Sequence, residues 1–183
     1  MRIISGTLKA RQIKAPQGSD FRPTTDRVKE NIFNILGEKV KGAKVLDIFA
    51  GSGSLGLESI SRGSSEVFFI DKSEAAVEVI KKNLEYLSIF DKAQVIKGDA
   101  SRELHRLSGR SLIFDLIFLD PPYNINVAEL QSLFSLIAKC LDSSGLIIYE
   151  SGSDLSEDIV ASIKEIDKRS YGNTRVYFFK KTG

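Results

Sequence analysis

Asp120, Pro121, Pro122 and Tyr123 directly follow the apolar run 114–119. Each proline fixes its own φ at about −65° and restricts the residue before it, so this turn is stiff. The Asp120 carboxylate and the Pro121 carbonyl could accept hydrogen bonds from one small donor, while Tyr123 offers a flat face for a stacked base. We therefore expect these four residues to form a catalytic site for a planar ring with an exocyclic amine, such as adenine, cytosine or guanine.

A second candidate site lies in residues 47–56, which read DIFAGSGSLG. Gly51 and Gly53 would let a ligand approach the backbone where a side chain would collide. Asp71 comes twenty residues after Gly51, at the end of the next apolar run, where it could accept hydrogen bonds from both hydroxyls of a ribose. Glycines followed by an acid at this distance predict a site for a nucleoside cofactor.

The acid before the glycines favours S-adenosylmethionine over a dinucleotide. A dinucleotide needs its pyrophosphate at a helix N-terminus, whereas S-adenosylmethionine has no phosphate and presents an ammonium, a carboxylate and a sulfonium. Asp47 could contact the ammonium directly or through water. Asp99 could accept from the adenine amine or could instead cap the next helix. We expect the cofactor to contact Asp47, Phe49, Gly51, Gly53, Asp71, Lys72, Asp99 and Ala100.

The elements that must hold these residues alternate between strand and helix. We expect strands at 44–49, 66–70, 93–97, 114–119 and 146–149, and helices at 54–62, 74–87, 101–107 and 127–141. Such alternation predicts a parallel sheet covered by helices on both faces. Ligands bind at the carboxyl ends of the strands in sheets of this kind, which is where the candidate acids fall.

Less regular segments precede and follow this alternating region. Residues 2–13 suggest a β-hairpin around Gly6, and Thr24 or Thr25 would cap a helix that ends near Gly37. We expect an amphipathic helix at 155–166, followed by a hairpin with strands at 168–171 and 174–180 that turns at Gly172 and Asn173. The predicted organisation is one domain, 1–183, with an extension over 1–40 and a cofactor-binding core over 41–183.

Composition excludes several classes of protein. With 183 residues and 42% hydrophobic content, the chain can bury a substantial core. A single cysteine excludes an internal disulfide framework, and no Cys/His spacing suits zinc, so we expect no metal. No apolar run approaches the about 20 residues that cross a bilayer, and the N-terminus does not resemble a signal peptide. We therefore expect a cytoplasmic protein with no membrane partner.

Positive charge gathers near the N-terminus. Residues 1–29 carry seven bases against two acids, a net charge of +5, whereas the remainder carries 19 bases against 22 acids, a net charge of −3. A basic segment with interspersed polar residues would bind RNA through phosphate contacts and counterion release. It could equally be a solvated hairpin whose lysines protect an edge strand, and only the amine-binding turn favours RNA. The candidate RNA contacts are Arg2, Arg11, Arg22 and Arg27.

Residues 47–53 together with 120–123 resemble a class I S-adenosylmethionine-dependent methyltransferase that acts on an exocyclic amine. The chain further resembles the RsmD family in residues 1–6 (MRIISG), 22–30 (RPTTDRVKE), 51–58 (GSGSLGLE), 119–123 (LDPPY) and 171–174 (YGNT). The resemblance spans essentially the whole chain, and the Arg-Pro-Thr segment is its most specific part. Ser5 departs from the pattern, because such N-termini often show a glycine there.

The resemblance implies an α/β, Rossmann-like class I methyltransferase fold. Its sheet would be mostly parallel and seven-stranded with an antiparallel last strand, covered by helices on both faces and preceded by an N-terminal β-hairpin and helix. It also implies methylation of guanine N2 in small-subunit (16S) ribosomal RNA. The partner would be that RNA or the assembling small subunit, and the protein would act as a monomer.

Two other functions stay open. The first is adenine-N6 methylation of DNA or RNA, whose motif also reads Asp-Pro-Pro-Tyr, although such DNA enzymes usually need a target-recognition region that 183 residues scarcely accommodate. The second is a noncatalytic RNA-binding or ribosome-assembly factor with a vestigial cofactor pocket, against which the intact acids argue. Arg22 or Arg27 could also brace the cofactor pocket instead of contacting RNA.

Overall fold

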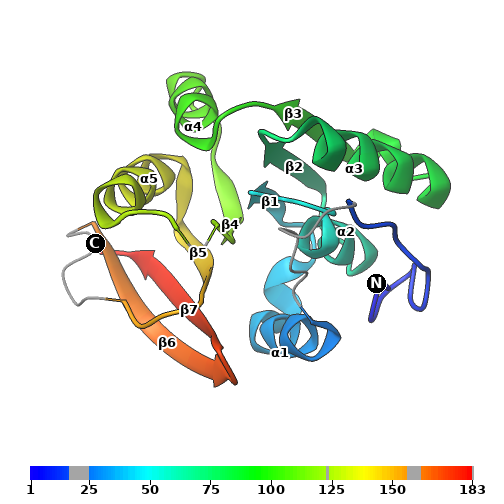
Figure 1. Ribbon diagram of the computed structural model, residues 1–183, viewed down its shortest axis with the longest axis horizontal. Helices are drawn as coiled ribbons and strands as arrows, with labels where there is room; N and C mark the ends of the chain where they lie inside the picture. Colours follow the sequence, from blue (N-terminus) through cyan, green and yellow to red (C-terminus); the bar gives the residue numbers. More distant parts are fainter. Residues whose placement is uncertain (17–24, 123, 156–161, 183) are drawn as a thin grey trace.

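The computed structural model describes residues 1–16, 25–122, 124–155 and 162–182 (Figure 1). Its helices are α1 (Asp26–Leu36), α2 (Ser54–Ser61), α3 (Glu74–Leu87), α4 (Ala100–Gly109) and α5 (Val127–Cys140), with the short 3-10 helices η1 (Gly37–Val40) and η2 (Phe90–Lys92). Its strands are β1 (Lys44–Ile48), β2 (Glu66–Asp71), β3 (Ala93–Lys97), β4 (Phe114–Leu119), β5 (Leu141–Ser151), β6 (Ile163–Tyr171) and β7 (Thr174–Lys181).

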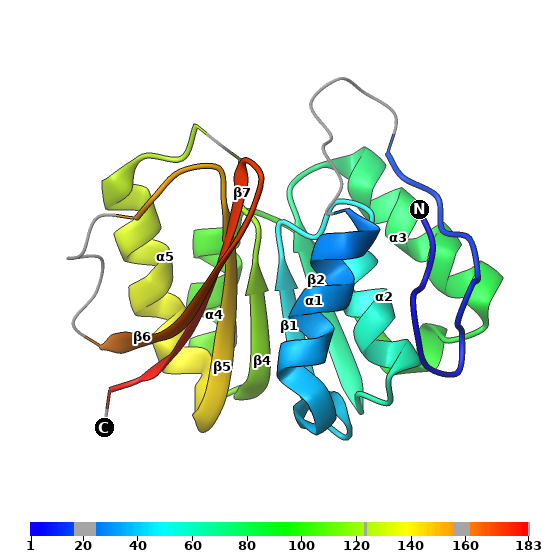
Figure 2. The same ribbon diagram turned by 90° about the horizontal axis from the view of Figure 1, so that it is seen from below.

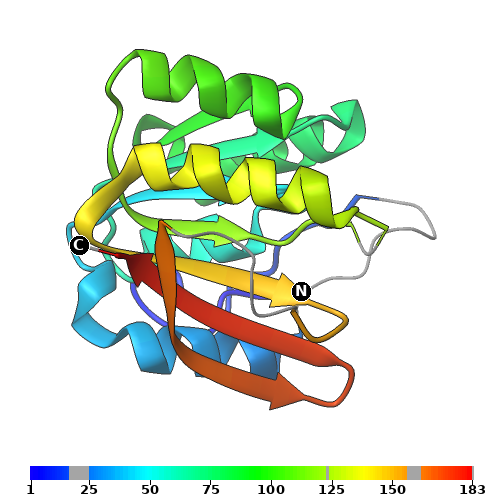
Figure 3. The same ribbon diagram turned by 90° about the vertical axis from the view of Figure 1, so that its left-hand side faces the viewer.

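The strands form one seven-stranded sheet in the order β3-β2-β1-β4-β5-β7-β6. Strands β1 to β5 are parallel, whereas β7 runs antiparallel to both β5 and β6. Figure 3 shows β7 beside β5 and β6 on its outer side. The predicted mostly parallel sheet with an antiparallel last strand is confirmed. The strand order reverses between β1 and β4, and the crevice at their carboxyl ends is the usual ligand site of such sheets.

Helices cover both faces of the sheet, as predicted (Figure 1). Apolar side chains of α1, α2 and α3 pack on one face in a core cluster that includes Phe118 of β4. Those of α4 and α5 pack on the other face in a second cluster that includes Leu119. Successive residues of β4 thus point to opposite cores, as the period of two in a strand requires.

Side-chain caps fix where several helices begin. Thr25 accepts from the Val28 amide at the start of α1, as the sequence predicts, and Ser73 caps α3 in the same way. Asp99 caps α4 and Asn126 caps α5. Ser73 and Asp99 follow β2 and β3 by two residues, so these two caps set the point at which the chain leaves the carboxyl edge of the sheet.

The N-terminal segment is less regular than the predicted β-hairpin. It contains one antiparallel bridge, between Arg2 and Gln12, and no longer strand among residues 1–16. Its turn presses on α2, because Thr7 N–H donates to the Ser61 carbonyl at 2.8 Å. Gly6 has φ +83°, and a Cβ there would lie 1.9 Å from the Ser61 carbonyl oxygen. Contact with α2 therefore shapes this segment more than strand pairing does.

The structure corrects two predicted elements near the C-terminus. Residues 163–166, expected to end an amphipathic helix, belong to β6 and pair with β7. Of the rest of that expected helix, Leu155 and Ser162 are described and are not helical, and residues 156–161 lie outside the described residues. Strand β5 begins at Leu141 rather than at 146 and extends to Ser151. Pairing with β4 on one side and β7 on the other explains the longer strand, since neighbouring strands satisfy its backbone groups.

Within the described parts of the chain, no helix is both long enough and apolar enough to span a membrane. The same residues contain no cluster of three or more His, Cys, Asp or Glu side chains placed to hold a metal ion.

Candidate active site

Acidic residues line the carboxyl edge of five neighbouring parallel strands. Asp47 lies in β1, Asp71 ends β2, and Asp99 follows β3 by two residues. Asp120 follows β4 directly, and Glu150 is the penultimate residue of β5. The sheet order places these acids in one row, with Asp47 and Asp120 on adjacent strands at the crevice.

Asp47 is buried beneath the glycine loop that joins β1 to α2. Its Oδ2 accepts a hydrogen bond from the Gly56 amide at 2.9 Å, which ties the first turn of α2 to β1. Burial raises the pKa of Asp47 to about 8, an effect increased by the Asp71 charge and opposed by the Gly56 N–H. A neighbouring ammonium group would therefore strongly favour ionisation of Asp47.

Asp71 holds the glycine loop from the adjacent strand. Its Oδ2 accepts from the Gly51 amide at 2.8 Å, and its Oδ1 accepts from the Ser73 amide at 2.8 Å. The loop itself needs unusual backbone angles, with φ of 55° at Gly51 and 76° at Gly53. Phe49 also has a positive φ, 60°, and lies partly buried beside the second core cluster. Each carboxylate oxygen keeps a further acceptor site, so contact with a ribose stays compatible with this arrangement.

The residues beyond β3 lie along the same edge. Asp99 is exposed and accepts from the Arg102 amide at 3.1 Å, which bears out its alternative prediction as a helix cap. Within the described residues, Asp99 Oδ2 accepts no hydrogen bond. This oxygen therefore stays available to accept from an adenine amine while Oδ1 caps the helix. Ala100 is buried and Lys72 is exposed. The structure thus gathers the predicted cofactor residues along β1, β2 and β3.

Asp120 continues the line of β4 into the proline turn. Its amide donates to the Ile48 carbonyl at 3.4 Å, so the chain still follows β1 at this point. Burial and the charges of Glu150 and Asp47 raise the pKa of Asp120 well above its ordinary value. Pro121 is buried and Pro122 is exposed, and the Pro122 carbonyl accepts from the Ile125 amide at 3.0 Å. Tyr123, the fourth predicted catalytic residue, lies outside the described residues.

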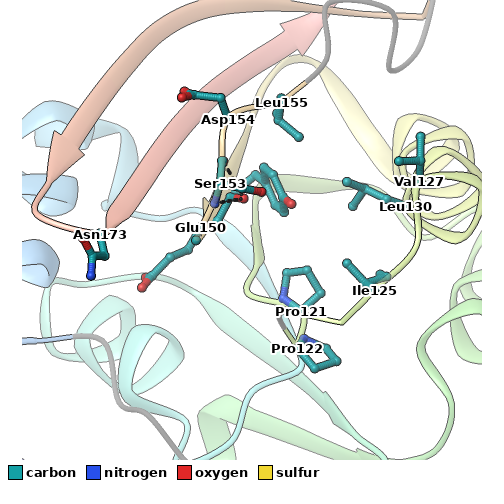
Figure 4. A pocket seen from close by; sticks show the side chains of 13 residues that line it. Pro121, Pro122, Ile125, Val127, Leu130, Glu150, Ser153, Asp154, Leu155 and Asn173 are labelled. Carbon is teal, nitrogen blue, oxygen red and sulfur yellow. Dashed lines mark hydrogen bonds between the residues drawn. The ribbon is translucent and has the colours of Figure 1, made fainter.

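A pocket of about 450 Å³ opens beside this turn (Figure 4). One wall is apolar and is formed by Ile125, Val127, Leu130 and Leu155. Polar groups line the rest, among them Glu150, Ser153, Asp154 and Asn173. This size and this mixture of walls suit a small planar ligand such as a nucleobase.

Glu150 is a candidate site residue that the sequence analysis missed. Leu119 pairs with Tyr149 between β4 and β5, so the next residues along the two strands are Asp120 and Glu150. The sequence does contain a signal for this residue, because Glu150 follows the apolar run 146–149 just as Asp120 follows the apolar run 114–119. The predicted strand ends at 149, one residue before this acid.

Two of the predicted RNA contacts lie near this edge. Figure 2 shows the start of α1, the start of α5 and the β6–β7 turn at the same end of the molecule. Arg2 and Arg27 belong to this end: Arg2 is exposed and donates to Asp26 of α1 at 2.9 Å, and Arg27 is exposed in the first turn of α1. Arg11 is also exposed, while Arg22 lies outside the described residues.

Comparison with known proteins places the chain among methyltransferases. Residues 1–180 match the family described as "Conserved hypothetical protein 95". The chain is 41% identical, over 100% of both sequences, to "Putative rRNA methyltransferase YlbH" of Bacillus subtilis. It is 34% identical to "Ribosomal RNA small subunit methyltransferase D" of Haemophilus influenzae over 84% of this chain and 80% of that protein. The solved structure "Putative methyltransferase yhhF from Escherichia coli" superposes with a TM-score of 0.85 at 30% identity, covering 99% of this chain and 97% of the other.

Proposed function

Because the chain belongs to the family described as Conserved hypothetical protein 95, we propose that it methylates the exocyclic N2 amine of a guanine in small-subunit ribosomal RNA, with S-adenosylmethionine as methyl donor. One observation carries the proposal. The rigid acceptor turn after β4 lies beside the glycine loop after β1, at the reversal of strand order. An amine held at the turn after β4 would thus meet a cofactor held at the glycine loop after β1.

The donor set of the glycine-loop region fits S-adenosylmethionine. Asp47 offers a buried carboxylate for an ammonium, Asp71 has acceptor capacity for ribose hydroxyls, and Asp99 has an oxygen for the adenine amine. Gly53 has φ +76°, and a Cβ there would lie 3.2 Å from Phe69 and Ile80, so the loop is packed closely as well as left-handed. When bound, S-adenosylmethionine supplies a methyl group on a positively charged sulfur.

Asp120 and the Pro121 carbonyl would hold the amine that receives this methyl group. A guanine N2 is a weak nucleophile, because its lone pair is delocalised into the ring. Accepting its two N–H bonds rotates the amine and stabilises the positive charge that grows on nitrogen. As the carbon–nitrogen bond forms and the carbon–sulfur bond breaks, N2 carries one proton too many, and Asp120 takes it. The raised pKa of Asp120 suits this step, since it makes the carboxylate a better proton acceptor.

The RNA would lie across the end of the molecule that carries Arg2 and Arg27. These side chains are exposed beside the start of α1, where they could contact phosphates while the target base enters the pocket beside Pro121. A base must leave its stack to reach a pocket of this kind, and the apolar wall would then cover it.

The experiment uses small ribosomal subunits from a strain that lacks the gene for this chain. We expect the purified protein and S-adenosylmethionine to add N2-methylguanosine at one position, detected by mass spectrometry of nucleosides and mapped in the RNA. N6-methyladenosine as the product would favour the adenine methyltransferase alternative. No methyl transfer despite measurable cofactor and RNA binding would favour the noncatalytic assembly factor.

A further inference from the structure

Glu150 occupies a position equivalent to that of Asp120 on the neighbouring strand. The pairing of Leu119 with Tyr149 makes Asp120 and Glu150 the next residues of β4 and β5. Leu119 and Tyr149 both point into the core beneath α5, so side chains one residue further along are directed to the opposite face. Two carboxylates on adjacent strand ends therefore face the same space, which lies beside Pro121.

The pocket view shows where Glu150 lies relative to Pro121. Figure 4 shows the Glu150 side chain reaching from β5 on one side of Pro121, with the apolar side chains of Ile125, Val127 and Leu130 on the other side. The Glu150 charge also raises the pKa of Asp120, which is the effect of a like charge close by. A ligand with a row of N–H donors would relieve this repulsion.

Guanine presents such a row, and the other amino bases do not. Its ring N1–H lies next to the N2 amine, so one edge carries adjacent donors. In adenine and cytosine the ring nitrogen next to the amine has a lone pair, which a carboxylate would repel. An acceptor turn for an amine fits all three bases, whereas a second carboxylate beside that turn fits guanine alone.

We propose that Glu150 selects guanine by accepting a hydrogen bond from N1–H while Asp120 and Pro121 hold the neighbouring N2 amine. The inference rests on the proposed function and adds the residue that determines its base specificity. Asp154, another acid of the same pocket, is not equivalent, because it lies three residues beyond the end of β5 rather than beside Asp120. Glu150 is thus distinguished by its position beside Asp120.

The test replaces the mapped target guanine by 2-aminopurine in RNA assembled from synthetic segments. 2-Aminopurine keeps the amine on C2 but has a lone pair in place of N1–H. We expect the parental protein to prefer guanine by on the order of 100-fold or more in kcat/KM, as sites built around a hydrogen-bond donor reject analogues without it. Glu150→Gln should lower this ratio by about 10-fold or more, because its amide can donate to the lone pair of 2-aminopurine.

Three measurements keep the result interpretable. Glu150→Ala should also lower the guanine preference, and both variants should keep the parental affinity for S-adenosylmethionine, which shows that the site is folded. Asp154→Asn, the matched control, should leave the guanine to 2-aminopurine ratio unchanged. A ratio that stays parental in Glu150→Gln, or that changes equally in Asp154→Asn, overturns the role of Glu150 alone. Absence of N2-methylguanosine with the parental protein overturns the proposed function and this inference together.

Discussion

Lys29 Nζ lies 3.9 Å from Glu58 Oε2, and both side chains are fully buried. Lys29 also donates to the Arg2 carbonyl at 2.6 Å and to Ser54 Oγ at 3.1 Å. Glu58 accepts from the amides of Ile4 and Ser5 at 2.7 and 3.0 Å. The Lys29–Glu58 pair therefore joins the N-terminal segment, α1 and α2. It holds the basic residues of the N-terminal segment close to α2, the helix that follows the glycine loop.

Lys29→Ala should strongly destabilise the fold. Glu58 would keep its ion pair with Arg62 at 2.7 Å but lose its fully buried lysine partner, which should cost on the order of 1–3 kcal/mol of unfolding free energy. Urea denaturation of both proteins measures it. Lys82→Ala is the matched control, because Lys82 pairs with Glu78 at 3.5 Å with both side chains more than half exposed, and it should change stability by at most about 0.5 kcal/mol. Similar losses in the two variants would contradict the role of burial.

Gly56→Ala should also destabilise the protein, by steric overlap. An added Cβ would lie 2.2 Å from the Phe69 ring, so α2 or β2 must shift, at a cost of about 1–3 kcal/mol. The shift should also weaken cofactor binding, since the Gly56 amide holds Asp47. Gly109→Ala, in α4 with no atom within 4 Å of the added Cβ, should not lower the thermal midpoint. Equal midpoints for the two variants would refute the packing argument.

Asp47 should make stability fall as pH rises from about 4 to 8. Its folded pKa is raised to about 8 from 3.8, so within this range the folded state holds a proton that the unfolded chain has lost. The stability difference between the parental protein and Asp47→Asn should therefore decline by up to about 1.4 kcal/mol per pH unit and level off above pH 8. A difference that stays constant from pH 5 to 8 would show that Asp47 is ionised in the fold.

Asp142→Asn serves as the control of opposite sign. The Ser144 amide lowers the pKa of Asp142, so its contribution to stability is present above the unfolded pKa and is lost as pH falls. Its stability difference from the parental protein should therefore stay constant between pH 5 and 8.

Methyl transfer should require ionised Asp120. Since burial and the Glu150 and Asp47 charges raise its pKa, the rate should rise with pH through a range above that of an ordinary carboxyl group. Glu150→Gln removes one of these charges and should move the acidic limb of the pH–rate profile to lower pH. Asp120→Ala should lower the rate by orders of magnitude while cofactor affinity stays nearly parental. Parental turnover by Asp120→Ala would show that the acceptor turn is not the reaction site.

Neutralising Arg11 and Arg27 together should weaken RNA binding. Each lost phosphate contact should reduce the slope of log K against log salt by just under about one unit. Affinity for S-adenosylmethionine should not change, because phosphate contacts do not involve the cofactor site. A selective loss of cofactor affinity, with an unchanged salt slope, would mean that α1 braces the cofactor site and that RNA is bound elsewhere.

Local signals predicted the central part of the fold accurately. The expected helix 74–87 and the strands 93–97 and 114–119 coincide with α3, β3 and β4. For these elements the local signals, namely helix caps, turn residues and the spacing of apolar residues, indicate the same element that packing in the fold requires. The acids at the ends of these strands were predictable for the same reason, since a parallel sheet brings its carboxyl ends together.

Long-range pairing explains what the sequence did not reveal. Residues 155–166 have the apolar spacing of an amphipathic helix, but pairing of β6 with β7 places 163–166 in a strand. The N-terminal segment alternates like a hairpin, yet contact of Gly6 with Ser61 shapes it. Glu150 was not predicted as a site residue because its position beside Asp120 depends on β5 being the neighbour of β4. No local sequence pattern specifies the order of strands in a sheet.

The two hydrogen bonds of Asp71 bear on the kinetics of cofactor binding. With one oxygen on the Gly51 amide and the other on the Ser73 amide, Asp71 sets the loop through contacts within the protein itself. A loop set in this way has little conformational entropy left to lose when a ligand arrives. Cofactor analogues that keep the ribose should therefore associate at similar rates, and their different affinities should arise from the time each one remains bound.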